Sequence, residues 1–246
     1  MRLKNKVSLI TGAGSGFGAG IAKKFSYEGA KVIIADINEG NASKIAKQTD
    51  GVAIKVDVSS KKSVETMVSS VIKKFGKIDI LVNNAGITHL PDAMETVTEQ
   101  QFDNIIAVNA KSIFLTAKCV VPHFKIKKSG TILNIASTGA ISPRPYLTWY
   151  NASKGWMITA TKSMAIELAP LGIRANAINP VAGETPLLKS FMGEDTPAMR
   201  KKFLATIPIG RFSTPTDIGA TATFLCSNEA SMITGVALEV DGGRCI

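Results

Sequence analysis

The sequence predicts an α/β protein in which a doubly wound, seven-stranded parallel sheet carries helices on both faces. Short β-rich segments alternate with helix-length segments almost from end to end, and most of these strands are apolar throughout. A strand that is apolar on both sides is covered on both sides, as happens in parallel sheets. Strand–helix alternation favours right-handed crossovers between parallel strands, and 246 residues suit a single domain.

Each element follows from this pattern. We expect strands at Val7–Ile10, Lys31–Ala35, Gly51–Val56, Ile78–Val82, Thr131–Ile135, Arg174–Ile178 and Ala237–Val240. The helix-length segments between them include Phe17–Tyr27, Lys61–Phe75, Gln100–Phe124 and Tyr150–Leu168. No linker and no internal repeat divides the chain, so one domain over residues 1–246 is predicted.

The segment Gly183–Pro208 breaks the alternation. It is long, contains three prolines, and mixes charged residues with apolar ones such as Leu187, Phe191 and Phe203. A long insertion with an apolar face in a compact domain is often a cover over a ligand site. The sequence therefore predicts a substrate lid at about 183–208; the alternative is a pair of surface helices packed on the core.

Composition excludes several classes of protein. The formal net charge of +10 attracts anionic small molecules, but the lysines are scattered and aromatic residues make up only 6%, so no nucleic-acid partner is predicted. No apolar run approaches the roughly 18 residues that span a bilayer, so no membrane partner is expected. The two histidines stand apart from carboxylates and thiols, which predicts no metal site.

The three cysteines are far apart, which excludes a disulfide framework and CxxC redox chemistry. This usage fits a reducing compartment. The first residues of the chain are typical of a strand that leads into a turn, and not of a secretory signal. A cytoplasmic location is therefore predicted.

A glycine-rich turn, Thr11–Gly18, directly follows the first predicted strand and opens a helix. Glycine permits positive φ and lets a phosphate approach the backbone, and the helix N-terminus offers free N–H groups to a pyrophosphate. A carboxylate, Asp36, ends the second strand 18 residues after Gly18. Together these features predict a dinucleotide site.

Asp36 also bears on the choice of dinucleotide. A carboxylate at this position accepts hydrogen bonds from ribose hydroxyls and repels a 2′-phosphate. Neither Ser15 nor Ile37 supplies a positive charge to reverse that preference. The predicted cofactor is therefore NAD in preference to NADP.

Tyr150 and Lys154 form a pair that could take part in catalysis. The i, i+4 spacing puts both side chains on one face of a helix. A phenol titrates near pH 10, and a neighbouring ammonium lowers its pKa toward the range useful for proton transfer. The pair predicts a general acid/base that exchanges a proton with a substrate oxygen.

Further motifs occur in order along the chain: Asp57-Val58, Asn83-Asn84-Ala85-Gly86, Asn109, Ser137, Tyr150-Asn151-Ala152-Ser153-Lys154 and Asn179-Pro180. With the glycine turn, this set resembles the short-chain dehydrogenase/reductase family over nearly the whole chain. The resemblance implies a Rossmann fold, an oxidoreductase acting on CH–OH groups, and a homotetramer.

The resemblance also implies roles for individual residues. The implied catalytic residues are Asn109, Ser137, Tyr150 and Lys154. Asn109 would lie at a helix irregularity and support a proton relay, Ser137 would hydrogen-bond the substrate oxygen, and Lys154 would hold the nicotinamide ribose. The implied cofactor-binding residues are Gly12, Ser15, Gly16, Phe17, Gly18, Asp36, Ile37, Asp57, Val58, Asn84, Ala85, Gly86, Tyr150, Lys154, Pro180, Val181, Gly183 and Thr185.

Three residues near these motifs remain open to two interpretations. Val181 stands where the family usually has glycine, so we expect a different loop path or a narrower pocket. Arg144, between two prolines, is either a contact for an anionic substrate or a solvated residue. His89 is either at the substrate entrance or a plain loop residue.

The predicted activity is NAD-dependent interconversion of a secondary alcohol and a ketone. The alternative is a 3-oxoacyl-acyl-carrier-protein reductase, for which the net charge and Lys128 suit an acidic carrier protein. Asp36 argues against its usual NADPH, and Leu171 occupies the position where such reductases usually carry an arginine. A nucleotide-sensing scaffold is a second alternative. The intact set of Asn109, Ser137, Tyr150 and Lys154 argues against it.

Overall fold

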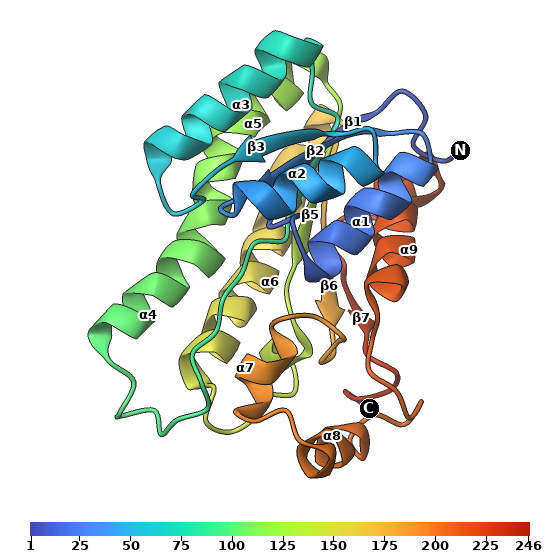
Figure 1. Cartoon of the computed structure of the whole chain (residues 1–246). Coiled ribbons are helices and arrows are strands. Elements are labelled where there is room, and N and C mark those ends of the chain that lie inside the picture. The colour runs from blue at the N-terminus through green and yellow to red at the C-terminus, as the bar shows by residue number, and fades with distance from the viewer.

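The computed structural model describes residues 1–246 and confirms the predicted fold class. Seven parallel strands form one sheet in the order β3-β2-β1-β4-β5-β6-β7 (Figure 1). The strands are β1 (Val7–Thr11), β2 (Lys31–Asp36), β3 (Val52–Lys55), β4 (Ile80–Asn83), β5 (Gly130–Ile135), β6 (Ile173–Pro180) and β7 (Ala237–Val240). The order reverses between β1 and β4, and the loops that diverge there leave a crevice at the carboxyl ends of the strands.

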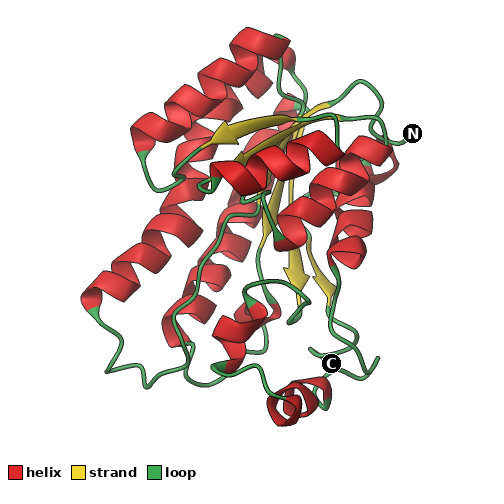
Figure 2. Ribbon diagram, in the orientation of Figure 1, coloured by secondary structure: helices red, strands yellow, loops and turns green.

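Helices cover both faces of the sheet (Figure 2). They are α1 (Gly16–Tyr27), α2 (Glu39–Gln48), α3 (Lys61–Phe75), α4 (Glu99–Ile106), α5 (Ser112–Lys127), α6 (Thr148–Leu168), α7 (Leu188–Met192), α8 (Pro197–Leu204) and α9 (Pro215–Cys226). On one face α1, α2 and α9 enclose a core that includes Phe25 and Ile34; on the other α3, α5 and α6 enclose a second core that includes Val71 and Phe124. The apolar strands are thus buried on both sides, as their composition predicts.

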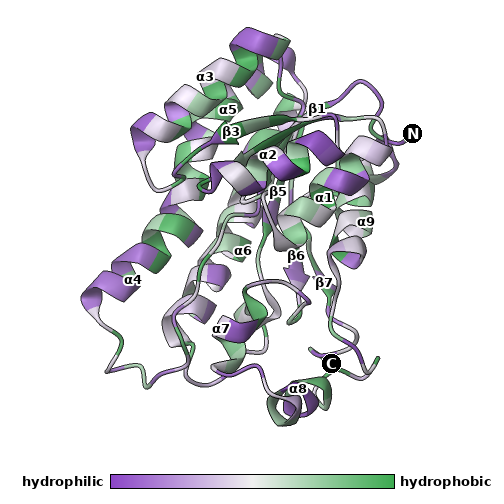
Figure 3. Ribbon diagram, in the orientation of Figure 1, coloured by the Kyte–Doolittle hydropathy of each residue, from purple (hydrophilic) through white to green (hydrophobic).

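The predicted helix Gln100–Phe124 is divided into α4, a π-helical turn at Ala107–Lys111, and α5. By length and composition alone, the helical run Glu99–Lys127 is long and apolar enough to cross a membrane. Close to half of its most apolar stretch is buried inside the molecule, and core helices of globular proteins can have the same length and composition. Figure 3 shows that α4 also carries hydrophilic residues.

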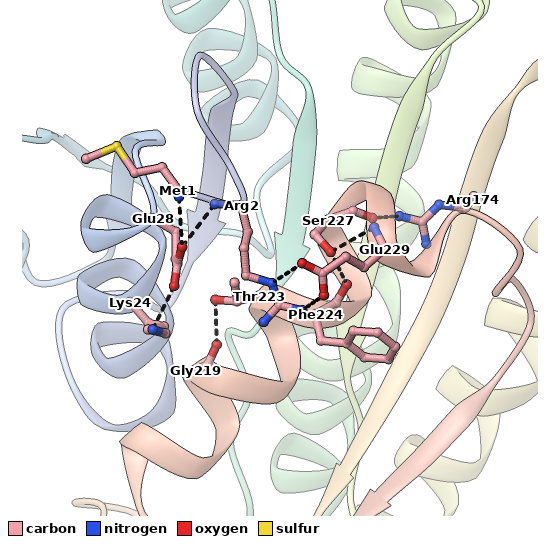
Figure 4. Close-up of polar contacts among 10 residues, drawn as sticks. All are labelled: Met1, Arg2, Lys24, Glu28, Arg174, Gly219, Thr223, Phe224, Ser227 and Glu229. Carbon is pink, nitrogen blue, oxygen red and sulfur yellow. Dashed lines mark hydrogen bonds and ion pairs between the residues drawn. The ribbon is translucent and has the colours of Figure 1, made fainter.

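Helices α1 and α9 pack closely because each has a glycine at the contact. The N-terminal residues bind beside this contact. A Cβ on Gly20 would lie 2.4 Å from the backbone oxygen of Pro215. Around this contact the Glu28 carboxylate accepts from the Arg2 backbone at 3.0 Å and from Lys24 at 2.8 Å (Figure 4). The Arg2 guanidinium in turn donates to Glu229 at 2.9 Å.

The segment predicted to be a lid contains α7 and α8, which lie beyond the carboxyl ends of the strands (Figure 1). Its residues Leu188, Met192, Phe203 and Ile207 pack with Val181 and Phe212, on either side of the segment, in a separate apolar cluster. The segment therefore forms one wall of the crevice. That it opens and closes as a substrate lid remains a prediction.

Candidate active site

A cleft of about 440 Å³ occupies the crevice at the carboxyl ends of the strands. Every residue that the sequence predicts for the site lines this cleft, except Gly18 and Asn109. Its walls come from the turn after β1, the ends of β2 to β6, the start of α6 and the segment with α7. The cleft has two ends, one around Asp36 and Asp57 and the other around Tyr150 and Arg144.

The glycine turn is held in place by the residues after β4. The Asn84 side chain donates to the backbone oxygens of Thr11 and Gly12 at 3.0 and 2.8 Å. Gly12 has φ of +61°, and a Cβ there would lie 2.7 Å from the Ala85 Cα. Gly18 lies away from the cleft, where a Cβ would come within 2.3 Å of the Gly12 oxygen, so its absent side chain serves helix packing.

Asp36 is part of the same turn. Its carboxylate accepts from the backbone N–H of Gly14 at 2.8 Å and from that of Asn38 at 2.9 Å. A Cβ on Gly14 would lie 2.9 Å from the Asp36 carboxylate, so glycine is required for this approach. The turn thus fixes the carboxylate at the edge of the cleft, beside exposed Ile37.

The remaining predicted cofactor residues close the same end of the cleft. The Asp57 carboxylate is held by the backbone and hydroxyl of Ser59, at 2.9 and 2.6 Å. On the opposite wall, a Cβ on Gly16 would lie 3.2 Å from the Thr185 Cβ, and one on Gly183 would lie 2.3 Å from the Phe17 ring. Glycine at both positions lets the chain after β6 approach the glycine turn.

These residues fit a dinucleotide. The turn before α1 is rich in glycine and leads to a helix N-terminus, which favours a pyrophosphate. The Asp36 carboxylate is positioned to accept hydrogen bonds from ribose hydroxyls. Lys154, on α6, lines the cleft together with Asn84 and Gly86 and offers a cation to a second ribose.

Tyr150, Ser137 and Lys154 converge beyond Gly86. Tyr150 is 6% exposed and packs edge-on against the Phe191 ring, with the ring centroids 5.0 Å apart. The Lys154 Nζ lies 5.9 Å from the Tyr150 ring centroid and donates to the Ile135 backbone oxygen at 2.8 Å. Ser137 follows β5, where its hydroxyl accepts from the Gly139 N–H at 3.0 Å.

The electrostatics of this group differ from the prediction that Lys154 lowers the pKa of Tyr150. Burial raises the pKa of Tyr150 to about 12, and a hydrogen bond with the Ser137 side chain acts in the opposite direction. Burial lowers the pKa of Lys154 to about 8. Desolvation of both groups outweighs their mutual attraction, because the ammonium is held by a backbone oxygen and not by the phenol.

Asn109 lies in the π-helical turn, the helix irregularity that the family resemblance implies. It is fully buried, and its side chain exchanges two hydrogen bonds of 2.9 Å with the Ile87 backbone and donates to the Ser153 hydroxyl at 3.0 Å. Asn109 thereby joins the loop after β4 to α6. The Ser153 hydroxyl in turn donates to the Tyr150 backbone oxygen at 2.7 Å, which links Asn109 to the backbone of Tyr150.

The other end of the cleft contains residues that the motifs do not identify. Its walls include the side chains of Ser142, Arg144, Leu147, Phe191 and Phe203. The loop with Arg144 is anchored to α6, because Asn151 donates to the Arg144 backbone oxygen at 2.9 Å. The sequence signals for Arg144 are its place in the chain between Ser137 and Tyr150 and its two flanking prolines. His89 is buried but does not line the cleft.

Val181 lies in the apolar core under α7 and α8 and also lines the cleft. It is 4% exposed. Its side chain occupies space that a glycine would leave open, which agrees with the expected narrowing.

Comparisons with known proteins agree with this geometry. A family model described as enoyl-(acyl carrier protein) reductase matches residues 12–244. A 4-formylbenzenesulfonate dehydrogenase of Comamonas testosteroni is 44% identical, and a 3-oxoacyl-[acyl-carrier-protein] reductase of Thermotoga maritima is 40% identical, each over the full length of both chains.

A crystal structure of a 3-ketoacyl-(acyl-carrier-protein) reductase from Brucella melitensis, complexed with NADH, superposes with a TM-score of 0.95. It is 52% identical, and the match covers 99% of this chain and 100% of that one. The protein belongs to the short-chain dehydrogenase/reductase family and is an oxidoreductase acting on CH–OH groups.

Proposed function

We propose that the protein interconverts a secondary alcohol and a ketone with NAD(H) as the hydride carrier. The observation that carries the proposal is the convergence of Tyr150, Ser137 and Lys154 on one cleft, beside a turn shaped for a dinucleotide. When bound, the nicotinamide supplies or accepts the hydride.

The chain itself handles the proton and the orientation of the substrate. In reduction, the Tyr150 hydroxyl donates its proton to the carbonyl oxygen; in oxidation, the phenolate accepts the proton of the alcohol. Ser137 donates a hydrogen bond to the same oxygen and so orients it. With its pKa raised to about 12, Tyr150 is protonated at neutral pH, which suits the reductive direction.

The preference for NAD rests on charge. The charged residues that line the cleft are Asp36, Asp57, Arg144 and Lys154, and both carboxylates belong to the adenosine end. A 2′-phosphate at that end would meet two like charges and no cation in the cleft wall. The NADH in the Brucella relative's structure supports the same choice.

A 3-oxoacyl-[acyl-carrier-protein] reductase is the second candidate, because two of the similar proteins bear that name. Its carrier protein is acidic, and the net charge of +10 favours such an encounter. The partly exposed Leu171 lacks the charge expected at a carrier contact. Turnover of an acetoacetyl thioester with NADH and with NADPH separates the two candidates.

We also propose a cytoplasmic homotetramer with α7 and α8 as the substrate lid. Large apolar side chains that subunit contacts would cover are exposed on α5 and α6: Phe114 is 54% exposed and Ile166 is 80% exposed. Sedimentation velocity measures the assembly.

The substitution Tyr150→Phe tests the proposed activity. We expect kcat to fall by about 10³-fold, because general acid/base catalysis typically contributes 10²–10⁴-fold. NADH binding, followed by fluorescence, should change less than threefold, since the ring and its contact with Phe191 remain. Equal turnover by the variant would contradict the proposed role of the phenol.

A further inference from the structure

We propose that the substrate carries a terminal oxyanion, a carboxylate or a sulfonate, which the Arg144 guanidinium binds at the substrate end of the cleft. This inference rests on the proposed function and defines its substrate class. Arg144 lines the cleft together with Ser137 and Tyr150. No carboxylate lies within 4.0 Å of its guanidinium, whose one hydrogen bond goes to the Thr206 hydroxyl at 2.9 Å.

Three other arginines of the chain are paired with carboxylates, among them Arg2 with Glu229. Arg200 pairs with Asp195 and Glu184, and Arg211 pairs with Asp217. Arg144 therefore stands out as a half-buried guanidinium with most of its five N–H donors free. A planar guanidinium is the side chain best matched to the oxygens of a carboxylate or a similar anion.

A second guanidinium strengthens the positive charge of this region. Arg244 donates to the hydroxyl and the backbone oxygen of Ser142, another residue of the cleft wall, at 2.6 and 3.3 Å. It too has no carboxylate partner, and its Nε is buried without a hydrogen-bond acceptor. Burial and the nearby Arg244 lower the pKa of Arg144 to about 10, so Arg144 is still charged at neutral pH.

The neighbouring walls indicate the rest of the ligand. The Arg144 guanidinium lies over the Phe203 ring, 4.2 Å from its centroid, which fixes its plane. Leu147, Phe191 and Phe203 supply apolar wall beside Tyr150. The matching substrate has a ketone or alcohol for Tyr150, an apolar body, and an oxyanion for Arg144.

A pair of ketones that differ only in charge tests the proposal. We choose 4-acetylbenzoate and its neutral methyl ester, each reduced with NADH. The native enzyme should show a kcat/KM at least tenfold higher for the acid. The substitution Arg144→Ala should lower kcat/KM for the acid by about 10- to 100-fold, as expected for a lost charge-assisted hydrogen bond, and change that for the ester less than threefold.

Two further variants separate anion binding from a purely structural link between Arg144 and Thr206. Arg144→Lys retains the charge and should recover part of the preference for the acid. Arg144→Gln retains a hydrogen-bond donor for Thr206 and should not recover it. The control Lys201→Ala removes an exposed charge from α8 and should leave the ratio unchanged. Equal losses of kcat/KM for the acid and the ester in Arg144→Ala, or recovery of the preference for the acid by Arg144→Gln, would overturn the proposal.

A binding measurement keeps this inference distinct from the proposed activity. Calorimetry with 4-methylbenzoate, which cannot be reduced, should show binding to the NADH-loaded native enzyme and at least tenfold weaker binding to Arg144→Gln. If the ester is turned over and 4-methylbenzoate does not bind, the oxyanion site is wrong while the activity stands. If 4-methylbenzoate binds in this way and neither ketone is reduced, the site stands and the activity is wrong for these ketones.

Discussion

The two ends of the cleft are built in different ways. The adenosine end is made of strand tips and a glycine turn, joined by short hydrogen bonds such as those of Asn84 to Thr11 and Gly12 and of Asp36 to Gly14. The substrate end is made of side chains from the loop before α6 and from the segment with α7 and α8. Its polar groups are less fully paired, as Arg144 shows.

The two ends also differ in how strictly the fold specifies their residues. At the adenosine end, backbone atoms approach each other so closely that only glycine fits, as at Gly12 and Gly14. At the substrate end, apolar packing around Phe203 and Val181 tolerates other side chains of similar volume. Under the proposed function, the first end would bind the dinucleotide and the second would select the substrate.

In the comparison of the two ends, the largest expected effect concerns charge at the adenosine end. Replacing Asp36 with Asn and Ile37 with Arg together removes the repulsion and adds a cation for a 2′-phosphate. We expect the kcat/KM ratio of NADPH to NADH to rise by about 100-fold, because a charge-assisted contact replaces a like-charge one. Asn retains an acceptor for the Gly14 N–H, so the turn should persist. Asp36→Asn alone should give part of the shift, and an unchanged ratio in the double variant would contradict the role of Asp36.

The next effect concerns the burial of Lys154. Its pKa is about 8 in the folded protein and ordinarily 10.5, the value taken for the unfolded chain, so between these values the unfolded chain binds more protons and stability rises with pH. The unfolding free energy of the cofactor-free native protein, minus that of Lys154→Met, should therefore increase by about 2 kcal/mol from pH 7.5 to pH 9.5. Denaturant titrations at the two pH values measure this difference.

A matched variant tests whether burial is the cause. Lys118→Met removes an exposed lysine from α5. Its unfolding free energy relative to the native protein should be nearly flat over the same range, because that lysine is solvated in both states. A pH-independent difference for Lys154→Met as well would mean that its ammonium is not desolvated in the folded protein.

The smallest expected effect concerns the substrate end. Phe203 lines the cleft, and Phe203→Leu keeps an apolar group of smaller area. We expect KM for an apolar ketone without an anionic group to rise about threefold, with kcat and NADH affinity nearly unchanged, since such a substrate meets Phe203 only as apolar wall. Steady-state kinetics measure it, with Phe75→Leu on α3 as the distant control. A larger effect on NADH affinity than on KM would show that the two ends are not independent.

The sequence by itself determined the sheet, the order of its motifs and the residues of the adenosine end. Those properties depend on local signals: apolar strands, a glycine turn after a strand, and a carboxylate at a strand end. Tyr150 and Lys154 were equally readable, because their spacing on a helix places them together.

The tertiary structure decided the rest. Gly18 serves packing and not the cleft, Asn109 is held by Ile87 and Ser153, and burial raises the pKa of Tyr150 although a lysine is nearby. Desolvation and pairing depend on which groups meet across the fold, and residues distant in sequence set both. The same holds for Arg144: its position between prolines is visible in the sequence, but its lack of a carboxylate partner is a property of the folded molecule.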